Sequence, residues 1–388
     1  MPHHATRSAF AGLCALVCAM GIGRFAYTPM LPRMLADAGL SAAAGGLIAS
    51  ANFIGYLAGA LLASSAFFGR RRLLWARVGL AGSIATTATM GLPLELIGWS
   101  IVRFFSGIGS AFVLVFASGL VLESIARAGR PTLSALPYAG VGIGIALSSV
   151  LIEIAARAGS SSAAMWWLLG LAALLFGAVG AVNLGSPRLN PASQPDAPAG
   201  VGSPPGGKQA LAWLTAAYGC MGFGYVVTAT FLVLMVRQLQ LGTAYETLAW
   251  VVTGLAAIPS NPLWMRAAQR WGDYWALAAA FVLQAVGVMV AAVAGGLAGV
   301  LIGAALLGGT FMAITALILP VGRRLGPDHA NRTIGRLTAA FGFGQIFGPA
   351  MAGWMADRSG SFLLPSSLAA SVLLAGAIMI GVARRCLR

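Results

Sequence analysis

The sequence is poor in charged residues, and above all in acids. Only 9% of its 388 residues are charged, and 9 Asp and Glu residues stand against 24 Lys and Arg residues. Hydrophobic residues make up 59% of the chain, whereas a soluble globular protein is about 45–50% apolar and about 25% charged. The composition excludes a soluble protein and predicts an integral membrane protein.

Residues that usually carry enzyme chemistry are also scarce. The chain has 3 His and 4 Cys residues, and the cysteines lie within or beside apolar stretches, where they indicate packing rather than disulfides or a metal site. It contains no Gly-x-Ser-x-Gly pattern, no His-Glu-x-x-His pattern and no phosphate-binding loop. We therefore predict neither an enzyme nor an ATP-driven pump, and we expect no metal and no cofactor.

Long apolar runs make up most of the chain. Most of them approach or exceed about 20 residues, the length that crosses about 30 Å of hydrocarbon as a helix. The pattern predicts an all-α membrane protein with twelve transmembrane helices, the first of them an uncleaved helix rather than a signal peptide. The runs cover approximately residues 9–32, 42–66, 73–91, 96–122, 132–154, 164–184, 210–236, 246–265, 274–294, 297–321, 334–356 and 362–383.

The Lys and Arg residues indicate the orientation of the chain. They form short clusters at one side of the predicted membrane, while the other side has only Arg33, Arg157, Arg237 and Arg358. By the positive-inside rule, this distribution places both termini in the cytoplasm. Because the clusters do not form a single basic stripe, we expect no nucleic-acid partner despite the net charge of +15.

The two halves of the chain are diverged copies of each other. The phrase Met20-Gly-Ile-Gly-Arg24 returns 201 residues later as Met221-Gly-Phe-Gly-Tyr225, and Gly308 follows Gly107 at the same spacing. Two copies of the same orientation imply a pseudo-two-fold axis along the membrane normal, with a binding site near the midplane between them.

A stretch rich in Pro, Gly and Ser separates the two copies, and this composition is typical of a flexible linker. We expect a six-helix bundle over 1–185, a cytoplasmic linker over 186–208 and a second, pseudo-symmetric six-helix bundle over 209–388.

Arg24 is the clearest candidate for a site residue. It lies about 22 Å along the first apolar run, yet every Asp and Glu maps to a predicted loop or helix end. A guanidinium keeps its proton at any usable pH, so Arg24 must be solvated or paired where it lies. Its partner is water, backbone carbonyls, Tyr and Asn side chains, or a bound anion such as a carboxylate or phosphonate. A purely structural role, as a snorkelling or helix-bridging cation, stays open.

Other polar side chains occur in the otherwise apolar helices. Singly, each suits hydrogen bonding between helices as well as contact with a ligand. As a group they offer a polar lining, and with Arg24 the predicted substrate-binding residues are Tyr27, Asn52, Tyr56, Tyr138, Tyr225, Thr228 and Gln345.

Three motifs resemble those of the major facilitator superfamily of secondary transporters. The run Arg103-Phe-Phe-Ser-Gly107-Ile-Gly109 matches its Arg-x-x-x-Gly-x-Gly signature. The run Gly69-Arg-Arg-Arg72 resembles the basic end of its cytoplasmic gating motif, although the acid expected before it is absent. The run Gly140-Val-Gly-Ile-Gly144 is similar to the glycine motif of the antiporter branch, without the proline expected next.

The resemblance covers nearly the whole chain and assigns these motifs to conformational coupling. Under it, Arg70, Arg71, Arg72, Arg103, Gly107, Gly109, Gly140 and Gly144 are the predicted coupling and gating residues. The run from Gly23 to Pro32 most resembles an uncharacterised bacterial branch of the superfamily, which implies the bacterial inner membrane. We also expect Glu153, at the end of a neighbouring helix, to be able to reach Arg103.

The predicted function is secondary transport of a small solute by alternating access. From the residues we favour an organic anion held by Arg24, with Tyr225 facing it from the other half. The alternative is a proton antiporter that exports amphipathic or cationic compounds, and a transporter-like sensor or lipid-handling protein ranks last. The expected partners are the substrate, the lipid bilayer and a coupling proton or counter-anion, and we expect a monomer.

Overall fold

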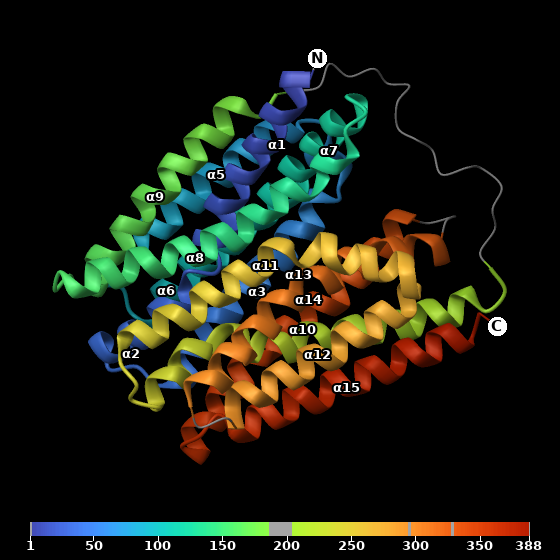
Figure 1. The fold of residues 1–388 in the computed structure, drawn as a ribbon. Helices are drawn as coiled ribbons and strands as arrows, with labels where there is room; N and C mark the ends of the chain where they lie inside the picture. The colour runs from blue at the N-terminus through green and yellow to red at the C-terminus, as the bar shows by residue number, and fades with distance from the viewer. Residues whose placement is uncertain (1, 186–203, 294–295, 327–329, 388) are drawn as a thin grey trace.

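The structure, a computed structural model, describes residues 2–185, 204–293, 296–326 and 330–387. Every regular element in those ranges is a helix, and most of the helices run side by side along a common direction (Figure 1). Nine helical segments there are long and apolar enough to cross a membrane, which confirms a multi-pass helical membrane protein. These segments are His4–Ala38, Ala42–Ala63, Leu96–Arg127, Pro131–Arg157, Ser162–Asn183, Gly207–Gln238, Asp273–Val293, Leu297–Leu325 and Leu363–Arg385.

The helices are divided by short turns, and two of the long segments contain a stretch of π-helix. In chain order the elements are α1 (Pro2–Leu16), the π-helix η1 (Val17–Ile22), α2 (Tyr27–Ala38), α3 (Ala42–Ala63), α4 (Ala66–Gly69), α5 (Arg72–Thr89), α6 (Leu96–Phe112), the π-helix η2 (Val113–Ala117), α7 (Ser118–Arg127), the 3₁₀ helix η3 (Pro131–Ala135), α8 (Leu136–Arg157), α9 (Ser162–Asn183), α10 (Gly207–Gln238), α11 (Thr243–Trp271), α12 (Asp273–Val293), α13 (Leu297–Leu325), α14 (Ala330–Ser359) and α15 (Leu363–Arg385).

Three further long helices, α5, α11 and α14, pack among the nine. Helix α5 contacts α6 and α9, α11 contacts α8 and α13, and α14 contacts α3 and α10. Helices α11 and α14 contain internal prolines, at Pro259 and Pro262 and at Pro349. Proline in a long membrane helix is tolerated where neighbouring groups satisfy the freed backbone. Twelve spans remain a prediction, because only nine helices meet the length and hydropathy criteria for a span.

Helices of the first and second halves of the chain lie largely on different sides of the molecule. In Figure 1, α1, α5, α7, α8 and α9 group together, and α10, α12, α14 and α15 form the opposite side. The halves meet where α3 packs against α14, α8 against α11, and α2 against α10. These three helix pairs place the contact between the halves next to Arg24, which lies just before α2.

The first long segment is not a continuous α-helix. It is a π-helix from Val17 to Ile22, then a turn through Gly23 and Arg24, and the α-helix resumes at Tyr27. The matching segment of the second half, α10, is one uninterrupted helix through Tyr225. The two copies therefore differ in backbone as well as sequence at the repeated phrase, and π-helical turns of this kind occur often at functional sites.

Glycines allow the helices to approach closely where the motifs lie. A Cβ atom on Gly107 of α6 would collide with the backbone of Asn52 and Tyr56 in α3, and one on Gly144 of α8 would collide with the Cα of Gly21. Gly142 of α8 and Gly254 of α11 pack against each other in the same way between the two halves. Small residues at these crossings give the close packing expected of membrane helices.

The described part of the predicted linker is short. Helix α10 begins at Gly207, so Gly207 and Lys208, predicted as linker residues, are helical instead. The preceding Gly206 has a φ of 72°, a conformation that glycine adopts at low cost. The linker prediction for residues 186–203 lies outside the described residues.

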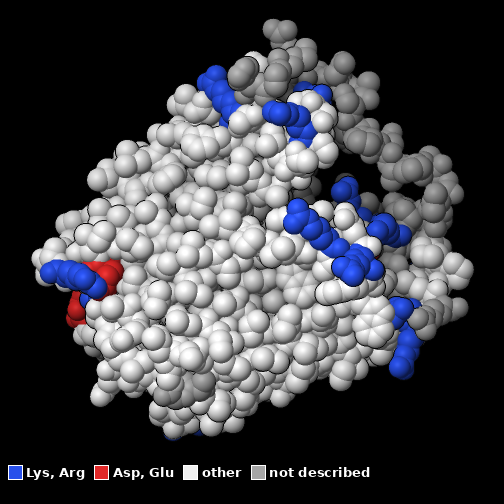
Figure 2. Space-filling view, in the orientation of Figure 1, with Lys and Arg blue, Asp and Glu red and all other residues white. Residues whose placement is uncertain are grey.

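Basic side chains gather at one end of the molecule. Figure 2 shows Lys and Arg residues near the end where both termini lie in Figure 1, and the visible surface between this end and the opposite one is nearly free of charge. An uncharged band between polar ends is what a lipid bilayer requires.

Candidate substrate site

Arg24 lies in the turn between η1 and α2 and is almost fully buried, with 4% of its surface exposed. None of the five ion pairs among the described residues includes it. Its Nε and Nη2 atoms are buried and have no hydrogen-bond partner. The guanidinium is therefore a buried cation with unused donors, as its position among apolar residues predicts.

Aromatic rings surround the Arg24 guanidinium on the first-half side. Its Cζ atom lies 4.0 Å from the ring centre of Tyr56, 4.9 Å from that of Phe53 and 5.7 Å from that of Phe25. Such rings attract a cation through their negative faces and offset part of the cost of removing it from water. The predicted residue Tyr56 thus lies at Arg24, and Phe53 joins it from the same helix, α3.

Tyr225 of α10 lies on the second-half side of the site, where its ring stacks on Phe311, which contacts Phe25 next to Arg24. Its ring is stacked between Phe311 of α13 and Phe341 of α14, with both ring centres at 5.9 Å and both planes 7° from parallel. Gln345 of α14 donates from its side-chain nitrogen to the Tyr225 hydroxyl oxygen. The second-half wall of the site is thus a rigid aromatic stack with a polar edge.

The two walls meet directly at one pair of rings. Phe25, next to Arg24, packs edge-on against Phe311 with ring centres 5.7 Å apart and planes at 73°. The Tyr218 ring stacks on the other side of Phe341 at 4.5 Å. The charge of Arg24 is also within Coulombic reach of the Tyr218 hydroxyl. Phe25, Phe311 and Phe341 have no polar group that would mark them in the sequence, so only the fold shows that they belong to the site.

Two buried acceptors of the second half, Gln345 Oε1 and Thr228 Oγ1, have no hydrogen-bond partner. Gln345 lies beside the Tyr225 hydroxyl, and Thr228 lies about one turn further along α10. Of the residues predicted to bind substrate, Tyr56 lies against the Arg24 guanidinium, and Tyr225 and Gln345 are bonded to each other on the second-half side.

Arg103 has a different role from Arg24. It is 3% exposed, and its Nη1 and Nη2 atoms donate to the backbone carbonyls of Gly23 and Arg24 at 2.8 and 2.9 Å. Ser106 donates to the same Gly23 carbonyl at 3.2 Å. These donors satisfy carbonyls that the break in the first segment leaves free, as buried backbone in a membrane requires.

The expectation that Glu153 reaches Arg103 is wrong. Glu153 accepts hydrogen bonds from Arg157, Thr243 and Thr247 instead, at 2.8 to 3.3 Å. Charge pattern alone could not show this, because the partner of Arg103 is backbone rather than an acid.

Three other predicted residues lie in supporting positions. Asn52 donates to the Arg103 carbonyl at 2.9 Å, and the Tyr27 hydroxyl donates to the Gly45 carbonyl at 2.8 Å. The Tyr27 ring also lies under the Arg103 guanidinium, 4.8 Å from its Cζ atom. Tyr138 is half-buried on α8, within Coulombic reach of Tyr56.

The basic residues after α4 fall into two groups. Arg72 binds Glu123 through both of its Nη atoms, and Arg127 lies 3.5 Å from the same carboxylate. Arg70 and Arg71 are exposed. The predicted gating residues therefore include one arginine that ties α5 to α7 and two that face the surroundings.

Two acids that the motifs do not mark join the halves at the other end. Asp357 of α14 accepts hydrogen bonds from the backbone nitrogens of Ala42 and Ala43, at 3.0 and 2.8 Å, at the start of α3. Glu153 of α8 holds Thr243 and Thr247 at the start of α11. Ala42 and Thr243 are 201 residues apart, so these contacts occupy matching positions of the repeat.

A helical membrane protein built from two repeated halves, with a buried arginine where they meet, has the make-up of a solute transporter. Residues 16–380 match the sequence model of a family described as the uncharacterised MFS-type transporter YbfB. Since the match covers nearly the whole chain, the chain belongs to this family, within the major facilitator superfamily of secondary transporters. The family match thus identifies the chain as a transporter. A search of curated proteins found no match.

Proposed function

We propose that this transporter carries a small organic anion, and that Arg24 binds the anionic group. The observation that carries the proposal is that Nε and Nη2 of Arg24 are buried and have no partner. These two N–H groups lie along one edge of the guanidinium and point the same way. A carboxylate accepts from such a fork through two parallel hydrogen bonds.

The energetic argument favours an anion at this position. A cation held within the membrane without a counter-ion costs several kcal/mol of free energy. Its attraction to the surrounding aromatic rings offsets about 0.5–2 kcal/mol of that cost. A bound carboxylate would supply both the missing charge and two acceptors. A cationic substrate would add a second positive charge beside Arg24, and no described Asp or Glu lies there to balance it.

The rest of the substrate would face aromatic side chains. Phe25, Phe53, Phe311 and the Tyr225 ring offer flat apolar surfaces, whereas Gln345 and Thr228 offer single polar contacts. A mostly apolar pocket with a few placed polar groups is typical of small-molecule sites. We therefore propose a carboxylate with a planar or apolar body rather than a sugar or a polyvalent anion.

Alternating access of two six-helix bundles would expose this site to each side in turn. We propose twelve spans, a division near residues 186–208 and both termini in the cytoplasm of a bacterial cell, in line with the positive-inside rule. Asp357 and Glu153 would then fasten the two bundles together at the outer side. The state described would be closed to the outside.

The coupling scheme follows from the chemistry of the site. Among the described residues, the side chains that stack on the Arg24 guanidinium or on the Tyr225 ring are aromatic, and no carboxylate or imidazole is among them. We propose that a symported proton travels on the substrate carboxylate, or that one anion is exchanged for another.

The proposal is tested by thermal stabilisation of the purified protein. A ligand that binds only the folded state raises the melting temperature. At a ligand concentration of 100 times its Kd, the free energy of unfolding rises by about 2.7 kcal/mol. We expect carboxylates with aromatic or apolar bodies to stabilise the wild type and to have no effect on Arg24→Ala. Arg24→Lys keeps the charge without the fork, so it should retain weakened stabilisation. Arg270→Ala, at an exposed arginine outside the site, is the matched control.

Two results would overturn the proposal. Equal stabilisation of the wild type and Arg24→Ala by the same carboxylate would remove Arg24 from the binding site. Stabilisation of both proteins by amphipathic cations, with no response to carboxylates, would favour the exporter of cationic compounds instead.

A further inference from the structure

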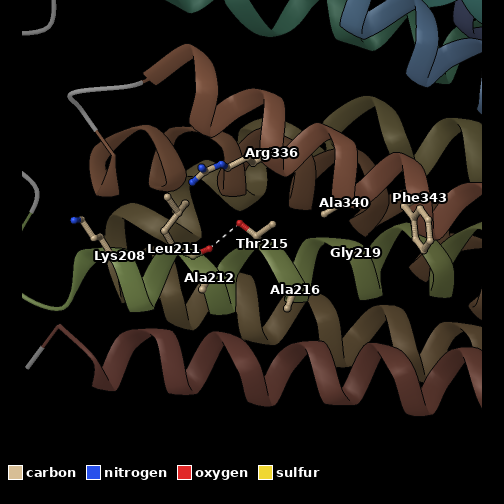
Figure 3. A pocket seen from close by; sticks show the side chains of 9 residues that line it. All are labelled: Lys208, Leu211, Ala212, Thr215, Ala216, Gly219, Arg336, Ala340 and Phe343. Carbon is tan, nitrogen blue, oxygen red and sulfur yellow. Dashed lines mark hydrogen bonds between the residues drawn. The ribbon is translucent and has the colours of Figure 1, made fainter.

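A groove lies between α10 and α14, away from the candidate substrate site. It encloses a cavity of about 590 Å³, and Figure 3 shows α10 contributing Lys208, Ala216 and Gly219 while α14 contributes Arg336 and Phe343. At 100° per residue, the α10 residues that line the groove lie about 40–180° around the helix from Tyr225, all on one side of it. The groove therefore opens beside the face of α10 that carries Tyr225, not on that face itself.

The groove is apolar along its length and basic at one end. Lys208 and Arg336 lie toward the same end in Figure 3, whereas small side chains and Phe343 line the remainder. No Asp or Glu is among the residues that line it. None of the ion pairs within the described residues uses Lys208 or Arg336, so both cations are available to a ligand.

The start of α10 adds to the positive potential at this end. Its cap residue, Gly206, provides no side-chain hydrogen bond, and its first turn contains no acid. The partial positive charge of a helix N-terminus favours an anionic group there. Lys208 belongs to this first turn, so two independent sources of positive potential coincide with Arg336 across the groove.

The length of the groove matches one leaflet of a bilayer. From Lys208 to Gly219 the helix rises about 16 Å at 1.5 Å per residue. Half of a hydrocarbon core of about 30 Å is about 15 Å. A chain that starts at the basic end would run along Ala216 and Gly219 and end near the bilayer midplane, beside Phe343.

From this arrangement we infer that the groove binds one anionic phospholipid. Its phosphate lies between Lys208 and Arg336, and one acyl chain fills the groove over Ala216, Gly219 and Ala340. Basic pockets between transmembrane helices are known to take anionic headgroups. The two cations without an ion-pair partner favour an anionic headgroup over a zwitterionic one.

Native mass spectrometry of the full-length protein with added lipid tests the inference. We expect the wild type to retain one phosphatidylglycerol more tightly than phosphatidylcholine. Lys208→Ala and Arg336→Ala should each weaken phosphatidylglycerol binding about fivefold, and the double variant more strongly, while phosphatidylcholine binding stays the same. The double variant Arg266→Ala/Arg270→Ala removes two exposed arginines elsewhere and serves as the matched control.

A second variant tests the acyl-chain part of the site. Ala216→Trp keeps both cations but fills the groove from an exposed position on α10, so it should displace the lipid without unfolding the helix. Glycerophosphoglycerol, which is the same headgroup without chains, should not compete with phosphatidylglycerol at matched concentrations. Full competition by this soluble headgroup would reduce the site to a surface phosphate site.

Two further results would overturn the inference. One is equal retention of phosphatidylglycerol and phosphatidylcholine by the wild type. The other is the same loss of phosphatidylglycerol in the Arg266→Ala/Arg270→Ala control as in the Lys208→Ala/Arg336→Ala variant, since binding would then follow the net charge rather than the groove. None of these outcomes concerns Arg24, so the lipid inference and the proposed function are tested independently of each other.

Discussion

At the scale of single residues, two buried arginines next to each other in space differ in how their Nη atoms are used. Arg103 donates from both Nη atoms to the carbonyls of Gly23 and Arg24 and has only its Nε atom without a partner, while Arg24 has both Nε and Nη2 without one. A guanidinium whose two Nη atoms both bind backbone carbonyls supports structure. A guanidinium whose Nε and Nη2 atoms are both free beside aromatic rings can bind a ligand that has two acceptors.

Replacement of each arginine by alanine should therefore have opposite effects on the ligand-free protein. Arg103→Ala removes two hydrogen bonds from a charged donor, each worth about 1.5–3 kcal/mol, and should lower the melting temperature clearly. Arg24→Ala removes an unpaired buried charge and should leave the melting temperature unchanged or raise it. Thermal unfolding without ligand measures both, and a larger loss in Arg24→Ala than in Arg103→Ala would reverse the two roles.

The sequence could predict some site residues and not others. Arg24 stands out because a charge within an apolar run is rare and costly. Phe53, Phe311 and Phe341 do not stand out, because an aromatic residue in a membrane helix has the same pattern whether it faces lipid, the core or a ligand. The backbone partners of Arg103 could not be predicted either, since they exist only because the first segment is broken.

At the scale of helices, the close crossing of α3 and α6 positions the α3 residues that lie around Arg24. Asn52, Phe53 and Tyr56 lie on α3, and Gly107 of α6 packs against the backbone of this same stretch. The position of the aromatic rings around Arg24 therefore depends on how near these two helices come.

Gly107→Ala should separate α3 from α6. The added Cβ would collide with the Asn52 carbonyl, and overpacking of this kind typically costs about 1–3 kcal/mol. We expect a lower melting temperature together with weaker carboxylate binding. Gly119→Ala is the matched control, because a Cβ at Gly119 of α7 has nothing within 4 Å. Equal behaviour of the two variants in both measurements would contradict the packing role of Gly107.

Hydropathy predicts the existence of the helices better than their shape. The apolar runs near residues 162–183 and 207–238 are helices whose ends differ by only a few residues from those predicted. The π-helix at Val17–Ile22 and the turn after it lie inside an apolar run that gives no sign of them. Their cause is three-dimensional, because Arg103 and Ser106 must be present to satisfy the freed carbonyls.

At the scale of the whole molecule, the repeat extends to the ion pairs, with the charges exchanged. Arg72 at the start of α5 binds Glu123 in α7, and Asp273 at the start of α12 binds Arg324 in α13. Each residue of the second pair lies 201 positions after its counterpart. Both pairs join helices of the same half. Because they are partly exposed, each contributes at most about 1 kcal/mol to stability.

The acids that join the halves should control the balance between conformations. Asp357→Asn removes a full negative charge from the N-terminus of α3, an interaction worth about 0.3–1 kcal/mol, and should shift the population toward the outward-open state by up to about fivefold. Electron paramagnetic resonance distances between spin labels on Leu40→Cys and Ser361→Cys, in a background with the four native cysteines replaced, would report the shift.

Asp37→Asn is the control for this shift. Asp37 lies at the end of α2 and contacts the backbone of Ser162 at the start of α9, within the same half of the chain. Its loss should leave the distances unchanged. Identical distance distributions in Asp357→Asn and the wild type would show that Asp357 does not hold the halves together.

The most direct test of the account is counterflow in proteoliposomes of an aromatic carboxylate against its neutral amide, which has the same shape without the charge. We predict that the wild type moves the carboxylate and discriminates against the amide, and that Arg24→Ala loses carboxylate counterflow and with it the discrimination. Carboxylate counterflow by Arg24→Ala at the wild-type rate and affinity would contradict the central claim that Arg24 binds the substrate anion.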